Sequence, residues 1–240
     1  MKNVIDVLNF MINNVKAGVY LLQNNTFVTL VSSQSYFIAA LILNLSFKQS
    51  NNKIPFTICL TENLVNKNNL NILKQENIPF EIIKCLNYNE NIQKLNKNHS
   101  VLNTASKIEI FNLKQYNKII YIDADSLILY NIEDLINYPD GSILKYPYEK
   151  YGMSGLFVIK PKNHDYDIYK FLIENYNGYD GEIIGKLFFP FLSNKKYQIP
   201  NNYLYNINNY LTFSKNIKGI HFNTPIKPFL FNNTEIEISK

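Results

Sequence analysis

The 240-residue sequence contains no arginine and no tryptophan, so all 24 of its basic residues are lysines. The absence of arginine excludes any mechanism that needs an arginine finger or a bidentate guanidinium clamp on a phosphate group. If the chain binds phosphate, it must use lysine, backbone N–H groups, a metal ion, or a combination of these.

Cysteine is also scarce, since Cys59 and Cys85 are the only two in the chain. Both lie in apolar, strand-like runs, and no Cys-x-x-Cys motif or Cys/His cluster indicates a zinc site. We interpret them as buried free thiols, which suit a reducing compartment, and we expect a cytoplasmic location. The N-terminus also lacks a basic region followed by an uninterrupted apolar stretch, so we expect no secretory signal.

Long apolar runs are missing too. Residues 17–47 carry no charge, but polar residues interrupt them, and the longest apolar piece is 36–43. A transmembrane helix needs ~18 or more apolar residues, so we predict a buried strand followed by a buried helix instead.

The composition that is present favours a folded protein, with 46% hydrophobic residues and 18% charged residues. We interpret the 38 asparagines and 32 isoleucines as the signature of an AT-rich genome. The formal net charge is only +5, and the lysine-rich stretches 67–74 and 94–97 contain few aromatics. Because there is no dense basic stripe, these stretches look like solvated faces, and we expect no nucleic-acid binding.

Apolar patterning predicts an alternation of strands and helices after residue 25. Residues 2–15 have a helical spacing of apolar positions, so we expect 1–25 to be a helical extension packed on one domain over 26–240. Strands are predicted over 27–31, 54–60, 79–86, 118–123, 142–146, 154–159 and 217–222, and helices from 36 onward and over 61–75, 104–116 and 164–176. This alternation predicts an α/β fold with a mostly parallel central sheet flanked by helices.

The strongest local signal is the run Tyr121-Ile122-Asp123-Ala124-Asp125 at the end of a predicted strand. The carboxyl ends of strands are where open α/β sheets bind ligands. Two carboxylates one residue apart can address one hard cation such as Mg²⁺ or Mn²⁺. On its own the motif could equally be a solvated acidic turn.

Two further places carry candidate site residues. His221 follows the late strand and could join two carboxylates on a metal ion, and Lys227 could reach a diphosphate from a proline-rich loop. Asp180, between two glycines in the run 177–181, could be a helix N-cap or could face a ligand.

In this order and spacing, the motifs resemble the glycogenin-like glycosyltransferases, the retaining family 8 with the GT-A nucleotide-diphospho-sugar transferase fold. The resemblance runs from about residue 27 to 229. It places the following residues at family positions that bind the nucleotide sugar: Leu30, Ser32, Tyr36, Lys107, Asp123, Ala124, Asp125, Ser154, Gly155, Asp180, His221 and Lys227.

The resemblance implies a metal-dependent hexosyltransferase. Asp123, Asp125 and His221 would bind Mn²⁺ or Mg²⁺, and Asp180 and Lys227 would be catalytic. The reaction would transfer a hexosyl group from a UDP-sugar, with UDP-glucose favoured, to a hydroxyl of a glycan or protein acceptor with retention. A covalent intermediate and a front-face route are equally consistent. Dimers occur in the family, so a homodimer is possible.

Some residues depart from the family pattern. Met153 stands where the family usually has an asparagine that contacts the donor sugar, and Gly181 stands where it has a glutamine. Ser33 and Thr224 also differ from the usual residues. The alternative is therefore a catalytically impaired nucleotide-sugar or carbohydrate-binding protein on the same fold. A nucleotidyltransferase is less consistent, because residues 27–36 lack a glycine-rich, basic phosphate loop.

Overall fold

A computed structural model describes residues 24–95, 103–147, 149–207, 216–223 and 227–230. Its centre is a seven-stranded sheet in the order β3-β2-β1-β4-β7-β6-β8. The strands are β1 (Asn25–Val31), β2 (Phe56–Thr61), β3 (Phe80–Ile83), β4 (Lys118–Ile122), β6 (Ser142–Lys145), β7 (Met153–Ile159) and β8 (Gln198–Pro200). All pairs are parallel except those of β7 with β4 and with β6, so the expected mostly parallel α/β sheet is confirmed.

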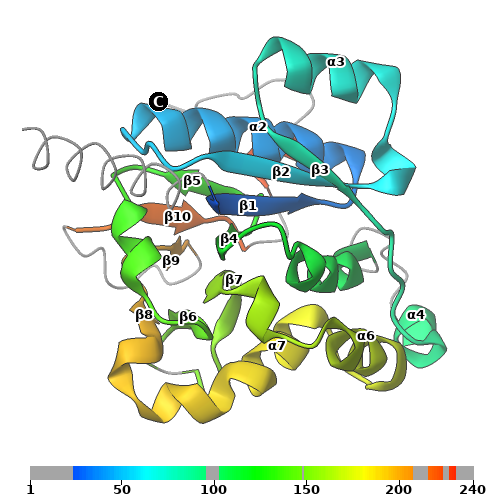
Figure 1. Ribbon diagram of the computed structural model, residues 1–240, viewed down its shortest axis with the longest axis vertical. Coiled ribbons are helices and arrows are strands. Elements are labelled where there is room, and N and C mark those ends of the chain that lie inside the picture. The colour runs from blue at the N-terminus through cyan, green and yellow to red at the C-terminus, as the bar shows by residue number, and fades with distance from the viewer. Residues whose placement is uncertain (1–23, 96–102, 148, 208–215, 224–226, 231–240) are drawn as a thin grey trace, which may run out of the picture.

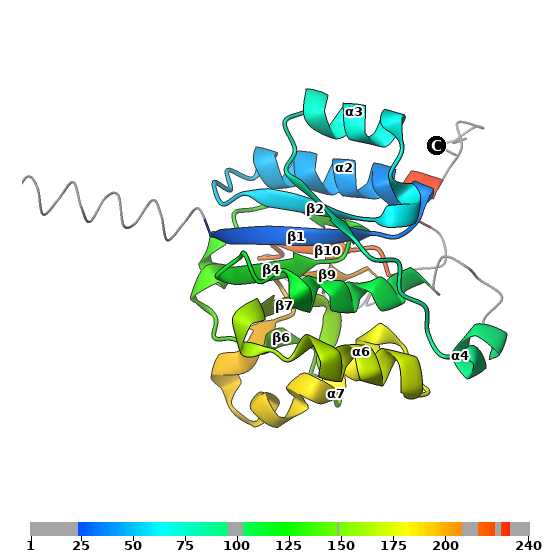
Figure 2. The ribbon, with the colours of Figure 1, turned by 45° about the vertical axis from the view of Figure 1, so that its right-hand side comes forward.

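Helices cover both faces of this sheet (Figure 2). One face carries α2 (Gln34–Gln49) and α3 (Lys67–Gln75), and the other carries η2 (Asn103–Asn112), α6 (Tyr166–Asn175) and α7 (Asp180–Phe188). Each face has its own apolar core. Because both faces are covered, β1 and β2 are buried along almost their whole length, which explains why their sequences combine apolar residues with threonine and contain no charged residue.

The remaining described elements are short. They are η1 (Glu62–Leu64), α4 (Glu90–Leu95), η3 (Glu133–Asn137), η4 (Pro161–Asn163), η5 (Phe189–Ser193), η6 (Lys195–Tyr197) and η7 (Pro228–Leu230). A second sheet has the order β5-β10-β9, formed by β5 (Ser126–Ile128), β9 (Tyr205–Asn206) and β10 (Gly219–His221). Figure 1 and Figure 2 show strands of this small sheet next to β1 and β4 of the large sheet.

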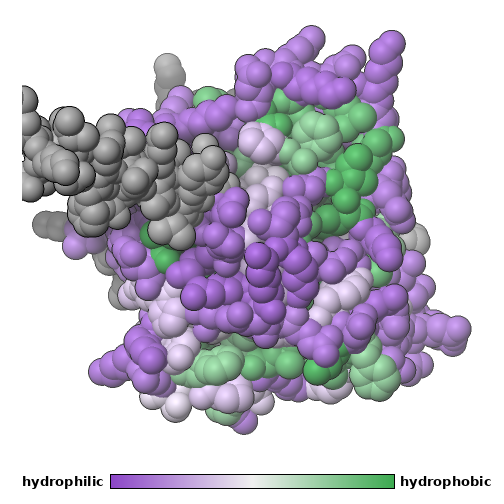
Figure 3. Space-filling view, in the orientation of Figure 1, coloured by the Kyte–Doolittle hydropathy of each residue, from purple (hydrophilic) through white to green (hydrophobic). Residues whose placement is uncertain are grey.

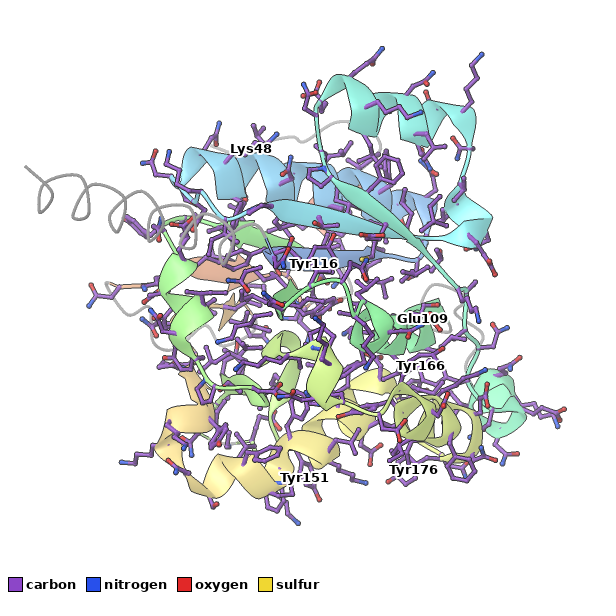
Figure 4. All side chains as sticks on the ribbon, in the orientation of Figure 1. Lys48, Glu109, Tyr116, Tyr151, Tyr166 and Tyr176 are labelled. Carbon is purple, nitrogen blue, oxygen red and sulfur yellow. The ribbon has the colours of Figure 1, made fainter. Side chains whose placement is uncertain are left out.

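The structure corrects several predicted elements. Residues 104–116, expected as a helix, form the shorter helix η2, which has 3₁₀ geometry and nearly all of its side chains buried. Apolar side chains of η2 pack in the same core as those of α6 and α7. Glu109 of η2 also accepts a hydrogen bond from Tyr166 of α6, and Figure 4 shows these two residues side by side. The helix expected over 61–75 is divided into η1 and α3, because the Asn66 side chain caps α3.

Other expectations have mixed outcomes. Cys59 is fully buried as expected, but Cys85 is only partly buried, because it lies beyond the end of β3. Lys67 and Lys74 are exposed on α3, and the face drawn in Figure 3 is mostly hydrophilic with scattered apolar patches. In the part of the chain that the structure describes, no helix is long and apolar enough to cross a membrane. Residues 1–23 of the predicted N-terminal extension lie outside that part, and Asn25 already belongs to β1, so the extension and the single domain over 26–240 stay predictions.

Candidate active site

A cavity of about 780 Å³ lies at the carboxyl ends of β1 and β4. The structure brings all twelve residues that the sequence analysis singled out to its wall: Leu30, Ser32, Tyr36, Lys107, Asp123, Ala124, Asp125, Ser154, Gly155, Asp180, His221 and Lys227. They come from the ends of β1, β4 and β10, from α2, β7 and η2, from the start of α7 and from the residue before η7. This strand edge is the usual ligand site of open α/β sheets, and the size suits a small-molecule site.

Three of these side chains form a candidate metal centre. Asp123 follows β4, Asp125 precedes β5, and His221 reaches them because β10 pairs with β5 in a register that opposes His221 and Ser126. The His221 Nε2 atom lies 3.1 Å from Asp125 Oδ1 and 3.6 Å from Asp123 Oδ2. One ligand atom from each of the three lies within 4.8 Å of the others. Two carboxylates and one imidazole suit Mn²⁺ or Mg²⁺.

Gly155 packs tightly against two of the three candidate ligands. A Cβ atom at this position would lie 3.0 Å from His221 Cε1 and 3.1 Å from Asp123 Oδ2, closer than ordinary van der Waals contact. The glycine backbone is itself fixed, because its carbonyl accepts a hydrogen bond from the Asp123 N–H at 2.9 Å. A side chain at this position would therefore press on the imidazole and this carboxylate, whereas glycine lets them converge, and the donor set fits the implied metal ion.

Lys227, which lies just before η7 near the C-terminus, contacts the same candidate metal centre. Its Nζ atom donates to Asp125 Oδ2 and to the carbonyl oxygen of Phe222. Burial alone would raise the pKa of Asp125, but the hydrogen bond from His221 and the charge of Lys227 outweigh it and lower this pKa to about 2. Asp125 is therefore ionised at neutral pH, as a metal ligand must be.

Lys107 is a second cationic side chain in the cavity wall, and it is more buried than Lys227. Its Nζ atom lies 2.7 Å from Asp180 Oδ2, 3.0 Å from Asp123 Oδ1 and 3.3 Å from Ser154 Oγ. Burial favours the neutral amine, but the two carboxylates outweigh it and raise the pKa of Lys107 above its usual range. The ammonium group thus links the metal centre to Asp180 and remains charged.

Asp180 is the first residue of α7, and the N-cap position is occupied by Tyr179, so Asp180 is not a cap. Its side chain lines the cavity instead, as expected of a residue that faces a ligand. Although burial alone would raise the pKa of Asp180, Lys107 lowers it, with help from hydrogen bonds from Tyr88 and Thr104. A carboxyl group held ionised in this way can orient a ligand or oppose positive charge, but it cannot donate a proton at neutral pH.

Leu30, Ser32 and Tyr36, which the resemblance assigns to the nucleotide, also line the cavity. The Tyr36 ring packs edge-on against Phe229, with centroids 5.5 Å apart. Met153 and Gly181, the two departures from the family pattern near the donor sugar, also line the cavity.

Sequence reasoning missed several residues of the site. Tyr121 donates a hydrogen bond to Asp123 Oδ1 at 2.7 Å, and the period of two along β4 could have indicated that these side chains share a face. Thr104 and Tyr179 line the cavity without any motif of their own. Tyr88 contacts Asp180 from a segment between β3 and α4, and its local sequence carries no signal.

Comparison with known proteins supports this picture. The family model of glycosyl transferase family 8 matches residues 27–153, which is more than half of the chain. Glycogenin-1 of Mus musculus is 26% identical over 219 residues, covering 86% of this chain and 66% of that protein. A putative UDP-glucuronate:xylan alpha-glucuronosyltransferase 3 of Arabidopsis thaliana is 36% identical over 89 residues, or 35% of this chain and 14% of that protein. The chain thus spans just under two thirds of the length of the glycogenin it matches.

Solved structures with the same architecture include the galactosyltransferase LgtC in complex with donor and acceptor sugar analogues. Its TM-score is 0.60 at 14% identity, over 85% of this chain and 88% of that one. The apo form of the glycosyltransferase GlyE of Streptococcus pneumoniae has a TM-score of 0.58 at 13% identity, over 88% and 56% of the two chains. At these identities the likeness concerns the fold.

The sheet, its helical layers and the Asp-x-Asp centre at the strand ends define a protein with the GT-A fold of glycosyltransferases. Within that class, the chain belongs to glycosyl transferase family 8. The family resemblance and the fold expected from the sequence are both confirmed.

Proposed function

We propose that this protein is a metal-dependent retaining hexosyltransferase that moves a hexosyl group from a UDP-sugar, with UDP-glucose favoured, to an acceptor hydroxyl. The observation that carries the proposal is the convergence of Asp123, Asp125 and His221 beside Lys227 in one cavity. Further support comes from the relatives, since the Arabidopsis protein is named for a UDP-sugar donor and LgtC was solved with donor and acceptor sugar analogues.

The main barrier that the protein can lower is the charge that develops on the leaving diphosphate. Asp123, Asp125 and His221 would hold Mn²⁺ or Mg²⁺, which when bound supplies Lewis-acid stabilisation of that charge. Lys227 would add a second positive charge at the same end of the cavity, in a role that arginine often fills elsewhere and that this chain leaves to lysine. Closure of the segment that carries Lys227 would exclude water from the leaving group.

Asp180 and Lys107 would act at the sugar end of the cavity. Because Asp180 is held ionised, its carboxylate would orient a sugar hydroxyl and stabilise positive charge at the anomeric carbon, rather than protonate a leaving group. Lys107 would fix the distance between this carboxylate and the metal centre, since it pairs with both Asp180 and Asp123. Ser154 would complete the floor under the sugar.

A second candidate function rests on Met153 and Gly181, which line the cavity where the family pattern has polar side chains. These residues favour a nucleotide-sugar or carbohydrate-binding protein with impaired catalysis. Binding of UDP with Mn²⁺ does not separate the two candidates, because both predict it.

Turnover separates them. The enzyme proposal predicts Mn²⁺-dependent hydrolysis of at least one UDP-hexose to UDP and free sugar, and faster UDP release when a suitable glycan or protein acceptor is added. A panel of UDP-sugars that shows no turnover with or without acceptors would reject the enzyme and leave the binding protein. Asp125→Ala should abolish metal-dependent UDP binding, whereas Asp167→Ala, an exposed aspartate on α6, should leave it unchanged.

We also propose a cytoplasmic location and a possible homodimer. Both cysteines are free, which suits a reducing compartment. Cell fractionation tests the location, and sedimentation velocity at several protein concentrations tests the dimer.

A further inference from the structure

The structure assigns Tyr88 as a positioning residue that holds the Asp180 carboxylate in a single orientation at the sugar end of the cavity. The inference rests on the proposed function, because the role of Asp180 is defined there. The juxtaposition joins three segments that are far apart in sequence: the connection after β3 that carries Tyr88, helix η2 with Thr104, and the start of α7 with Asp180.

The hydroxyl group of Tyr88 bonds to Asp180 twice. It donates to Asp180 Oδ1 at 2.7 Å and accepts the Asp180 backbone N–H at 2.8 Å. The Thr104 hydroxyl lies 2.8 Å from the same carboxylate oxygen and 2.8 Å from the Tyr88 oxygen. One phenol therefore fixes both the first turn of α7 and the side chain that this turn presents.

The two oxygens of Asp180 have different partners. Lys107 occupies Oδ2, while Tyr88 and Thr104 occupy Oδ1. Lys107 alone cannot define the orientation, because its ammonium group is a point charge that it also shares with Asp123. The terminal torsion of an aspartate is broad, so a carboxylate held at one oxygen only can rotate. Tyr88 and Thr104 remove this freedom together at Oδ1, and of the two hydroxyl groups it is the Tyr88 one that also holds the Asp180 backbone N–H.

The phenol is itself held firmly in place. Tyr88 is 1% exposed, and its ring packs edge-on against that of Tyr179 at 5.6 Å. The next residue, Asn89, donates from its side chain to the Tyr176 carbonyl at 2.7 Å and contacts Asn177 Oδ1 at 3.2 Å. Tyr88 and Asn89 together therefore bond to both ends of the turn that precedes α7. Burial raises the pKa of Tyr88 above its usual range, so the phenol keeps the proton that it donates.

The test compares Tyr88→Phe with Tyr146→Phe. Tyr146 is an equally buried tyrosine whose hydroxyl bonds to the Leu204 carbonyl at 2.7 Å, away from Asp180. We expect Tyr88→Phe to lower kcat for UDP-sugar turnover by roughly tenfold or more, with KM for the donor and the affinity for UDP with Mn²⁺ within about twofold of wild type. Tyr146→Phe should keep kcat within about twofold. Equal losses in the two variants, or no loss in Tyr88→Phe, would overturn the assignment.

A double variant shows whether Tyr88 acts through Asp180. In an Asp180→Asn background, Tyr88→Phe should change the residual kcat by less than about twofold, because the group that it positions is already altered. A full second loss on top of Asp180→Asn would mean that Tyr88 acts by another route.

A crystal structure of ligand-free Tyr88→Phe gives a readout that does not depend on turnover. The Asp180 carboxylate should rotate or occupy more than one orientation, and an orientation identical to wild type would reject the role of Tyr88. If the wild-type protein turns over no UDP-sugar, the proposed enzymatic function fails, and the carboxylate orientation still decides the role of Tyr88.

Discussion

Replacing Gly155 with alanine gives the sharpest test of the metal centre. The added Cβ would lie 3.0 Å from His221 Cε1 and 3.1 Å from Asp123 Oδ2, between two of the three candidate ligands. The backbone at Gly155 has little room to retreat, because its carbonyl is bonded to the Asp123 N–H. The imidazole and the carboxylate must therefore move apart.

The geometry gives the size of the effect. Ordinary contact to a Cβ atom begins at 3.4 Å, so the His221 ring must move by about 0.4 Å. The Asp123 carboxylate must move away from the Cβ atom as well, by about 0.3 Å. Because the two ligands move apart, their shifts add to more than the ~0.5 Å that a functional site tolerates. We expect the affinity for Mn²⁺ in the presence of saturating UDP to fall by about 10- to 100-fold, the range seen when the supports of metal ligands are removed.

The measurement is a calorimetric titration of Mn²⁺ into each variant at fixed UDP, with thermal unfolding as a check on the fold. Gly181→Ala is the matched control, because its Cβ would meet only Ser154 Oγ at 3.1 Å, away from the three ligands. Its Mn²⁺ affinity should stay close to that of wild type. Wild-type affinity in Gly155→Ala, or an equal loss in both variants, would refute the steric argument.

The remaining predictions concern stability and reactivity. Lys107→Met leaves two carboxylates without their buried cation and should lower the free energy of unfolding by about 3 kcal/mol or more; a loss under about 1 kcal/mol in urea unfolding would contradict the ion-pair assignment. The pKa of Asp125 falls from 3.8 to about 2 on folding, so its contribution to stability is complete above pH ~4 and is lost as the pH drops toward 2. Asp125→Asn should flatten the acid unfolding curve of the metal-free protein in that window, and an unchanged curve would count against the pairing. A thiol reagent should label Cys85 and leave Cys59 unreacted until the chain unfolds, because Cys59 is fully buried and burial also raises its pKa; two labelled thiols in the native protein would contradict the structure.

The strands were predictable because their sequences reflect burial on both faces. In β2 every residue from Phe56 to Thr61 is buried, and such runs stand out from the polar connections around them. The Asp123/Asp125 pair was predictable for a related reason, since an apolar strand that ends on two acids places charge at the ligand-binding edge. Its partnership with His221 came from the family resemblance, because the pairing of β10 with β5 is a long-range contact without a local signal.

The parts that could not be predicted depend on tertiary contacts. Tyr88 has no neighbours in sequence that mark it as a site residue, and its partners Thr104 and Asp180 are 16 and 92 residues away. The 3₁₀ geometry of η2 likewise has no marker in its local sequence, and its side chains pack in a core shared with α6 and α7. Residues that position other residues therefore cannot be identified from sequence motifs alone.

Under the proposed function, the charges in the cavity explain how a site without arginine would bind a diphosphate. Asp123, Asp125 and Asp180 carry three negative charges, and Lys107 and Lys227 carry two positive charges, so these five groups leave one net negative charge. Both lysines are already paired with carboxylates, so neither can attract a diphosphate at full strength. A divalent cation held by Asp123, Asp125 and His221 would reverse the sign to one net positive charge and would weaken the hold of Asp125 on Lys227. The affinity for UDP should therefore depend on the metal ion more than on either lysine, and Lys227→Ala should weaken UDP binding far less than removal of the metal with a chelator.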